Sequence, residues 1–419
     1  MKLYHMTFDE RLKALTDRQV LSAQDYEVLM QSYHHSVLND RGEVIEQMIG
    51  TYPQPLAIVE QLPMNGDLVS VVMSIEQLHI VPGLNNAAKW VRNFGELCTA
   101  CLSKGVMAQL FYKRSHMAEI QKYIQEQKEL ILLDANTTVA SLMRDKGGGL
   151  KEMAVRCVNE TECVLEIIVD AVGYRAEHEL RRIGDWLAAR IKDHISCQSS
   201  LTVVSRYTPQ QLYQAEIFLH GFQQHVCEDI VHKFELANDD VARALNNNLS
   251  IANAVTAVLS VTGNDTRALS GNMHAYAARS GSYKPLSHFS CTDDGMLYGS
   301  VTMPIMAAVE EGGAVIHPMA KRCMDIMQIQ SVDDLAFRAL SCGLLANFAA
   351  LYQHVKRHQE IPTNIRTHCK KIALQLDVSP LEFDHFVSKL ESSMRQAGKL
   401  TVADAKDILI RMRSQSTVI

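Results

Sequence analysis

Between residues 107 and 207 the apolar pattern changes in an order that few folds can accommodate. Segments with the period of a strand alternate here with two amphipathic helical segments and one polar turn. In chain order they are Met107–Lys113, His116–Leu133, Met153–Val158, Cys163–Val169, Ala176–Ile195 and Leu201–Tyr207. The resulting order, strand–helix–strand–strand–helix–strand, is typical of a ferredoxin-like domain.

The chain on either side is long enough for further domains, since 419 residues correspond to two or three domains of roughly 100–200 residues. Upstream we expect short helices over Phe8–Leu15, Ala23–Gln31 and Asn85–Leu97 and a strand over Leu68–Ile75. Downstream we expect helices over Gln210–Leu236, Ala252–Ser260, Leu269–Arg279, Leu335–Val355, Thr367–Leu376, Pro380–Ala397 and Thr401–Arg411, the last with Thr401 as its N-cap. The predicted fold class is therefore α/β (α+β). A large domain in two parts, 1–104 and 209–365, receives a small domain over 105–208 and is followed by a helical appendage over 366–419.

Composition excludes several classes of protein. A net charge of −6 and a pI near 6.3 argue against a nucleic-acid partner. No apolar run approaches the ~18 residues of a membrane span, and Met1–Glu10 lacks the apolar segment of a signal peptide. Ten cysteines are too few for a disulfide scaffold of this size. We therefore expect a cytoplasmic protein with reduced thiols and without a nucleic-acid or membrane partner.

Three short motifs carry weak signals. Lys146–Gly149 permits the close backbone approach that a phosphate-binding loop requires, but a flexible connector is the better interpretation because the Lys-Ser/Thr ending is missing. Asp170 and Gly173 lie between a strand and a helix, where a dinucleotide or an ordinary turn fits. Cys98 and Cys101 have metal-ligand spacing without a second pair, so we expect two thiols on a buried helix. The scattered histidines form no ligand set, and we predict no metal.

The densest signal is Val261–Arg267, followed by His274–Gly281. Its Gly263-Asn264-Asp265 turn follows an apolar run and presents an amide and a carboxylate. On physical grounds alone, a ligand-binding turn and a helix cap explain these residues equally well.

Together these segments resemble class II (bacterial) 3-hydroxy-3-methylglutaryl-CoA (HMG-CoA) reductases over almost the whole chain. Beyond the turn at Asp265, the resemblance rests on Ile45–Thr51, Asn85–Lys89, Gly147–Gly149, Thr208–Leu212, Leu297–Pro304 and Gly312–Pro318. It implies an HMG-CoA reductase-like large domain, a nucleotide-binding ferredoxin-like insertion and a C-terminal helical flap. It also implies an acyl-CoA or carrier-protein thioester, NAD(P)H, and a homodimer whose interface lies near Ile45–Thr51.

The resemblance implies four catalytic side chains, and only Asp265 matches the family. The catalytic Glu position holds Gln77, the Lys position holds Leu249, and the His position holds Asn364. Leucine cannot stabilise an oxyanion, and losing one such donor costs about 10²–10³ in rate. The catalytic site is thus predicted to be degenerate.

The resemblance also implies that some positions that bind the substrate in the family keep polar side chains. By the same resemblance Arg243 falls on the carboxylate-binding Arg, Asn253 and Asn264 fall on polar pocket positions, and His79 replaces a substrate-contacting Ser. The cofactor signature is reduced to Asp170–Arg175, so whether NAD(P)H is a cofactor stays unknown.

Three hypotheses follow. The chain binds an acyl thioester and has lost or replaced the standard reduction, with Asp265, Gln77 and His79 in its site, as in an enzyme of natural-product biosynthesis. Alternatively it is a non-catalytic dimeric scaffold. Thirdly, it is an active reductase with relocated groups, such as Glu76 or His358, and with Arg243 or Arg267 as the cation near Asp265.

Overall fold

The computed structural model describes residues 3, 6–34, 47–75, 77, 79–172, 176–292, 295–309, 318–356, 365–376, 378–397 and 400–416. These residues form a mixed α/β structure with three sheets. Gly173, Glu76, His358 and Asn364 lie outside the described residues, as do most of Gly312–Pro318 and the first two residues of Ile45–Thr51.

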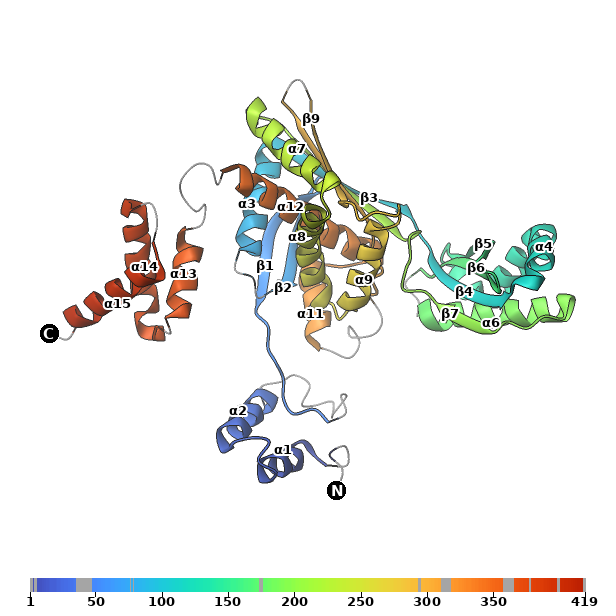
Figure 1. The fold of residues 1–419 in the computed structure, drawn as a ribbon, viewed down its shortest axis with the longest axis horizontal. Helices are drawn as coiled ribbons and strands as arrows, with labels where there is room; N and C mark the ends of the chain where they lie inside the picture. Colours follow the sequence, from blue (N-terminus) through green and yellow to red (C-terminus); the bar gives the residue numbers. More distant parts are fainter. Residues whose placement is uncertain are drawn as a thin grey trace.

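The small domain is the predicted ferredoxin-like unit (Figure 1). Its elements are β4 (Val106–Lys113), η3 (Arg114–His116), α4 (Met117–Thr137), α5 (Ser141–Arg144), β5 (Gly149–Cys157), β6 (Glu162–Asp170), α6 (Ala176–Ile195) and β7 (Leu201–Val204). The strand order is β5-β6-β4-β7, and every neighbouring pair is antiparallel. Helices α4 and α6 bury apolar side chains such as Ile124 and Leu187 against Leu110 and Leu165 of the sheet. The sequence prediction is confirmed because each element carries its own apolar period.

The large domain contains two sheets and a central helix. A hairpin of β1 (Leu56–Met64) and β2 (Asp67–Ser74) lies beside a four-stranded antiparallel sheet. That sheet has the order β3-β8-β10-β9, built from β3 (Gly95–Ser103), β8 (Leu212–Leu219), β10 (Leu297–Pro304) and β9 (Ser287–Cys291). The helices are α3 (Ile80–Phe94), α7 (Gln224–Asp239), α8 (Val241–Ser260), α9 (Thr266–Ala277), α11 (Pro318–Met327) and α12 (Val332–Lys356).

Helix α12 is buried on nearly all sides, as its apolar sequence predicts, and packs against α8, α3 and β8. Within the described part of the chain, Val332–Gln353 is the one helix long and apolar enough to cross a membrane, and most of it is buried inside the large domain. That burial is expected of a core helix.

Two sequence predictions are wrong here. Gln210–Leu236 is not one helix, because its first half is strand β8, where Tyr213, Ala215 and alternate residues after them are fully buried. Cys98 and Cys101 lie half-buried on strand β3 rather than on a buried helix. Both errors have one cause, since the partner strands that select a sheet are distant in sequence.

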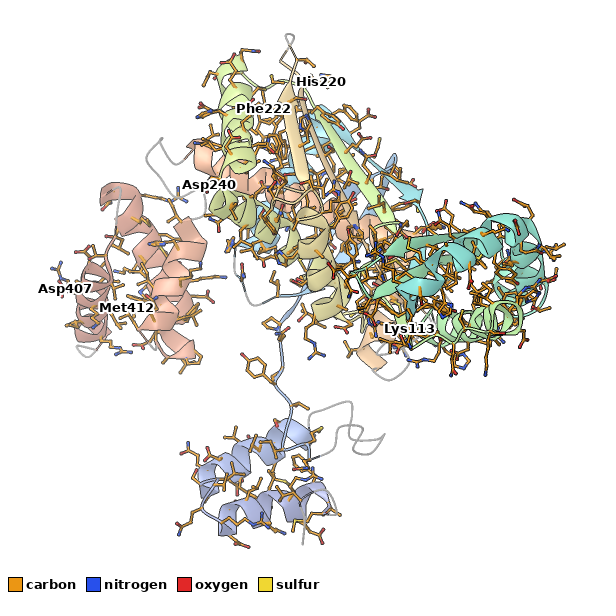
Figure 2. The ribbon with its side chains drawn as sticks, turned by 45° about the vertical axis from the view of Figure 1, so that its right-hand side comes forward. Lys113, His220, Phe222, Asp240, Asp407 and Met412 are labelled. Atoms are coloured by element: carbon orange, nitrogen blue, oxygen red, sulfur yellow. The ribbon has the colours of Figure 1, made fainter. Side chains whose placement is uncertain are left out.

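Both ends of the chain form helical units of their own. Helices α1 (Phe8–Asp17) and α2 (Ala23–His34) form the N-terminal unit, and residues 48–55 lead into β1 as an extended segment (Figure 1). At the other end α13 (Ile365–Gln375), α14 (Pro380–Ala397) and α15 (Val402–Ser416) enclose a separate core around Phe386. Figure 2 shows Asp407 and Met412 in this unit, which stands apart from the large domain in both views. Thr401 caps α15 as predicted, since its hydroxyl accepts from the Asp404 amide at 3.2 Å.

Candidate functional site

Helix α8 presents three predicted site positions on its outer side. Arg243 is exposed, Leu249 is 39% exposed and Asn253 is half-buried, whereas Ile251 and Val255 on the inner side belong to the core. An amphipathic helix produces this division, with polar residues facing outward. The position at which the resemblance predicts the family lysine is therefore accessible on the helix that carries Arg243 and Asn253, but it holds an apolar side chain.

Beneath this face, buried amides that the sequence reasoning missed anchor α8. Asn247 donates to Ser287 Oγ at 2.8 Å and accepts from Asn347 Nδ2 at 2.9 Å. Asn248 donates to the carbonyl of Lys284 at 2.9 Å and accepts from the Leu286 amide at 2.8 Å. The available signal was a run of three asparagines shortly before the helix predicted over Ala252–Ser260, since a buried amide needs partners.

Asp265 lies at the N-terminus of α9, where it is the N-cap. One carboxylate oxygen accepts from the amides of Arg267 and Ala268, each at 3.1 Å. The pKa of the carboxyl lies below its ordinary value, chiefly because of the Ala268 amide; burial opposes this effect, and the Arg267 amide and the Arg267 and Arg206 guanidinium groups lower the pKa further. The structure thus shows the helix cap, and the half-exposed carboxylate is ionised at neutral pH.

The cation beside Asp265 comes from its own helix. Arg267 Nε lies 3.8 Å from Asp265 Oδ1, and the arginine side chain is 96% exposed. A guanidinium in water interacts weakly with a developing charge, because the dielectric constant around it is high. This contact is a poor substitute for a buried ammonium.

Asn264 holds the turn before α9 against the chain that follows β10. Its Oδ1 accepts from the Ala308 amide at 2.7 Å, and its Nδ2 donates to Ala308 O at 3.1 Å and to Thr262 Oγ1 at 2.9 Å. The amide therefore has a structural task. A role in substrate binding stays a prediction.

Gln77 and His79 lie between β2 and α3. Gln77 is half-buried, and its carbonyl accepts from the Ile80 amide at 3.3 Å. His79 is exposed at the N-cap position of α3, and its carbonyl accepts from the Gly83 amide at 3.1 Å. Because β2 packs against α8, Gln77 follows a strand that neighbours the helix of Arg243 and Asn253.

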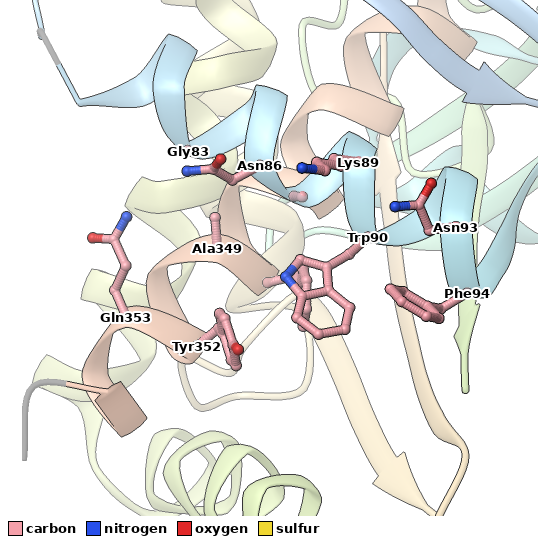
Figure 3. Close-up of a pocket in the computed structure, with 11 residues that line it drawn as sticks. Gly83, Asn86, Lys89, Trp90, Asn93, Phe94, Ala349, Tyr352 and Gln353 are labelled. Carbon is pink, nitrogen blue, oxygen red and sulfur yellow. The ribbon is translucent and has the colours of Figure 1, made fainter. Parts of the chain in front are cut away.

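A pocket of about 400 Å³ opens between α3 and α12, one helical turn beyond His79 (Figure 3). Its walls combine aromatic rings, side-chain amides and one ammonium group. The lining residues are Gly83, Asn86, Ala87, Lys89, Trp90, Asn93, Phe94, Phe348, Ala349, Tyr352 and Gln353. Trp90 stacks on Phe222 with ring centroids 4.7 Å apart, so its indole is held in place. Sequence reasoning missed this pocket, because α3 and α12 are far apart in the chain.

The strand–helix turn of the small domain is the candidate site for a dinucleotide. Asp170 Oδ1 accepts from the Val172 amide at 3.1 Å, so the carboxylate closes its own turn. A Cβ at Gly148 would lie 2.4 Å from the Asp170 carbonyl oxygen, which explains this glycine by close packing and supports the connector interpretation. The first turn of α6 carries Glu177 and Glu179, which pair with Arg206 at 2.9 Å and Arg182 at 2.6 Å, so these contacts engage two guanidinium groups that a pyrophosphate at this helix end would need. The described residues of this turn therefore do not fit NAD(P)H.

In the described ranges no three His, Cys, Asp or Glu side chains gather as metal ligands. The expectation of no metal stays a prediction.

Known proteins resemble this chain along nearly its whole length. The family model of hydroxymethylglutaryl-coenzyme A reductase matches residues 7–359. The 3-hydroxy-3-methylglutaryl-coenzyme A reductase of Archaeoglobus fulgidus is 26% identical over 423 residues, covering 98% of this chain and 94% of the relative. A probable enzyme of the same name from Borreliella burgdorferi is 28% identical over 375 residues, with 83% and 82% covered.

Solved structures agree with this similarity. The reductase of Streptococcus pneumoniae superimposes with a TM-score of 0.72 at 24% identity, covering 98% of this chain and 99% of that one. A class II enzyme of the same organism bound to NADPH, in open conformations, gives 0.71 at 25% identity, covering 84% and 98%. From the family match and these relatives, the chain belongs to class II of the hydroxymethylglutaryl-coenzyme A reductase family.

Proposed function

We propose that this chain is a divergent family member that binds an acyl thioester and does not reduce HMG-CoA with NAD(P)H. The observation that carries the proposal is the outer face of α8. There Arg243 and Asn253 remain available for a ligand, while Leu249 replaces the cation that reduction requires. A site with binding groups and no ammonium retains affinity and loses stabilisation of the oxyanion.

Thioester binding is supported by the pocket between α3 and α12. A pantetheine arm contains two amides and an apolar chain, and it is common to coenzyme A and to acyl carrier proteins. Asn86, Asn93 and Gln353 offer hydrogen bonds to such amides, Trp90 offers an apolar wall, and Lys89 suits a terminal phosphate. The pocket begins one turn from His79, so an acyl group at the end of the arm would reach the start of α3.

The chemistry proposed for the bound thioester is proton transfer rather than hydride transfer. Asp265 is ionised, as a general base must be, and His79 is exposed at the N-terminus of α3, one helical turn before the pocket. Gln77 can donate or accept a hydrogen bond but cannot exchange a proton. Such chemistry suits an enzyme of natural-product biosynthesis.

A cytoplasmic homodimer belongs to the same proposal. Apolar side chains at Ile49, Tyr52, Leu56 and Ile58 are at least 42% exposed along the N-terminal arm and the start of β1. A run of this kind is a surface that a second copy would cover.

The alternative of an active reductase with relocated catalytic groups is favoured by one observation: Arg267 Nε lies 3.8 Å from Asp265 Oδ1. If Arg267 supplied the missing charge, an Arg267→Gln variant would lose reductase activity. Under our proposal neither the wild-type chain nor the Arg267→Gln variant has reductase activity.

The indole of Trp90 provides the direct test of thioester binding. The chain has two tryptophans, and Trp186→Phe leaves Trp90 as the sole emitter. We expect pantetheine and coenzyme A each to change the Trp90 emission in a saturable way. Lys89→Gln should weaken coenzyme A by about tenfold or more and leave pantetheine unchanged, because only coenzyme A carries phosphates for the ammonium.

Arg92→Gln is the matched control, because Arg92 lies on the same helix and donates to Gln61 O at 2.6 Å outside the pocket. No change in emission with either ligand would reject thioester binding at this pocket and favour the scaffold. An equal loss of affinity for coenzyme A in Lys89→Gln and Arg92→Gln would show that Lys89 does not bind the phosphates.

A further inference from the structure

The chain crosses between the large and small domains twice. The first crossing joins β3 to β4 at residues 104–105, and the second joins β7 to β8 at residues 205–211 (Figure 1). Two linkers alone would let the small domain turn, so side-chain contacts at these linkers decide how firmly it is held.

Hydrogen bonds tie the two crossings together. The Gly105 amide donates to Gln211 Oε1 at 2.9 Å, and Gln211 Nε2 donates to the Tyr213 hydroxyl at 2.9 Å. That hydroxyl donates to Asp333 Oδ1 at 2.9 Å, and Lys104 Nζ lies 2.7 Å from Asp333 Oδ2. Because Lys104 and Gly105 are neighbours in the chain, these contacts form a closed ring.

The ring is anchored in the large domain. Tyr213 is fully buried in β8, and its ring packs edge-on against Phe337 of α12 at 5.9 Å. Burial, together with the Asp333 carboxylate, raises the pKa of the Tyr213 hydroxyl, so it stays a proton donor throughout the physiological range. Asp333 lies in the first turn of α12, the central helix.

On its other side, the ring packs tightly against the small domain at Gly105. A Cβ at Gly105 would lie 2.4 Å from Ile168 Cγ2 of β6. The second crossing has one more buried anchor, because the Thr208 amide and hydroxyl bond to Asn272 of α9 at 3.0 and 2.8 Å.

We propose that Lys104, Gly105, Gln211, Tyr213 and Asp333 form a clamp that fixes the orientation of the small domain. Opening the clamp releases the first crossing and the Gln211 end of the second crossing, while the Thr208–Asn272 anchor remains, and so loosens the hold on the orientation of the small domain. This inference does not depend on the proposed function.

Hydrogen exchange of the full chain, followed by mass spectrometry, tests the clamp. Tyr213→Phe removes one hydroxyl and keeps the buried ring. We expect exchange in peptides covering both crossings to accelerate by about fivefold or more, because Gln211 and Asp333 lose a buried partner. Amides of β4 and β6 should keep their wild-type rates, since the small domain stays folded.

Gln214→Ala is the matched control, because Gln214 follows Tyr213 on β8 and its side chain donates to Glu216 Oε1 at 3.4 Å, outside the ring. Lys104→Met opens the same ring from a partly exposed position and serves if Tyr213→Phe does not fold. The double variant should exchange no faster than either single variant, as expected of one closed unit. Wild-type rates at both crossings in Tyr213→Phe and in Lys104→Met, or equal acceleration in the control, would overturn the clamp.

Discussion

Asp265 is the one residue that the family resemblance predicts to be a kept catalytic side chain, and in the structure it begins helix α9. The sequence supported a ligand-binding carboxylate and a helix cap equally. The cap geometry resolves what the residue does for the fold, because two backbone amides converge on one oxygen. Its catalytic role remains a proposal.

Substitutions at Asp265 distinguish the contribution of its helix-capping hydrogen bonds to stability from the contribution of its charge. Asp265→Ala should lower the free energy of unfolding by about 1 kcal/mol, whereas Asp265→Asn, an equally good cap, should cost much less. The folded pKa lies below the ordinary value of 3.8. The charge therefore stabilises the fold above that value and loses its effect as pH falls through the folded pKa.

Urea unfolding at pH 7 and pH 3 measures both effects. The difference between wild type and Asp265→Ala should be larger at pH 7. Equal differences at the two pH values would show that the charge contributes nothing to the cap.

The remaining site residues show where sequence reasoning stops. Arg243 and Asn253 were placed by their spacing in a resembling family, and a helix does put them on its outer side. The pocket around Trp90 was not predicted, since its two walls come from helices that only the tertiary fold brings together. Gly173 and Asn364 fall outside the described residues, so their roles stay predictions.

At the level of elements, the small domain was predictable and strand β8 was not. Helices α4 and α6 and their strands show their periods locally. Strand β8 has a clear alternation, yet it is short and runs into α7, so the combined apolar pattern also fits one long helix. Pairing with β3 and β10 selects the strand.

Helix α8 depends on its buried amides for its position. Asn247→Ala should lower the free energy of unfolding by about 1–3 kcal/mol, because Asn347 and Ser287 would lose their buried partner. Leu249→Lys, on the outer side of the same helix, should change it by about 0.5 kcal/mol or less. Chemical denaturation of both variants compares them. A larger loss in Leu249→Lys would mean that Leu249 is a packing residue.

For the whole molecule, the family fold is kept while its reaction chemistry is predicted to be lost. Three separate apolar cores support the small domain, the large domain and the C-terminal unit. Fold depends on such distributed apolar patterns, which tolerate many substitutions. Reduction depends on a few side chains, and we predict that the leucine at position 249 removes its cation.

The most direct test is the oxidation of NADPH and NADH by the wild-type chain in the presence of HMG-CoA. A class II reductase serves as the positive control, and absorbance of the reduced nicotinamide is followed over time. We predict no oxidation above the rate without protein, even when coenzyme A changes the emission of Trp90. Sustained oxidation that depends on HMG-CoA would contradict the account and show that the chain is an active reductase.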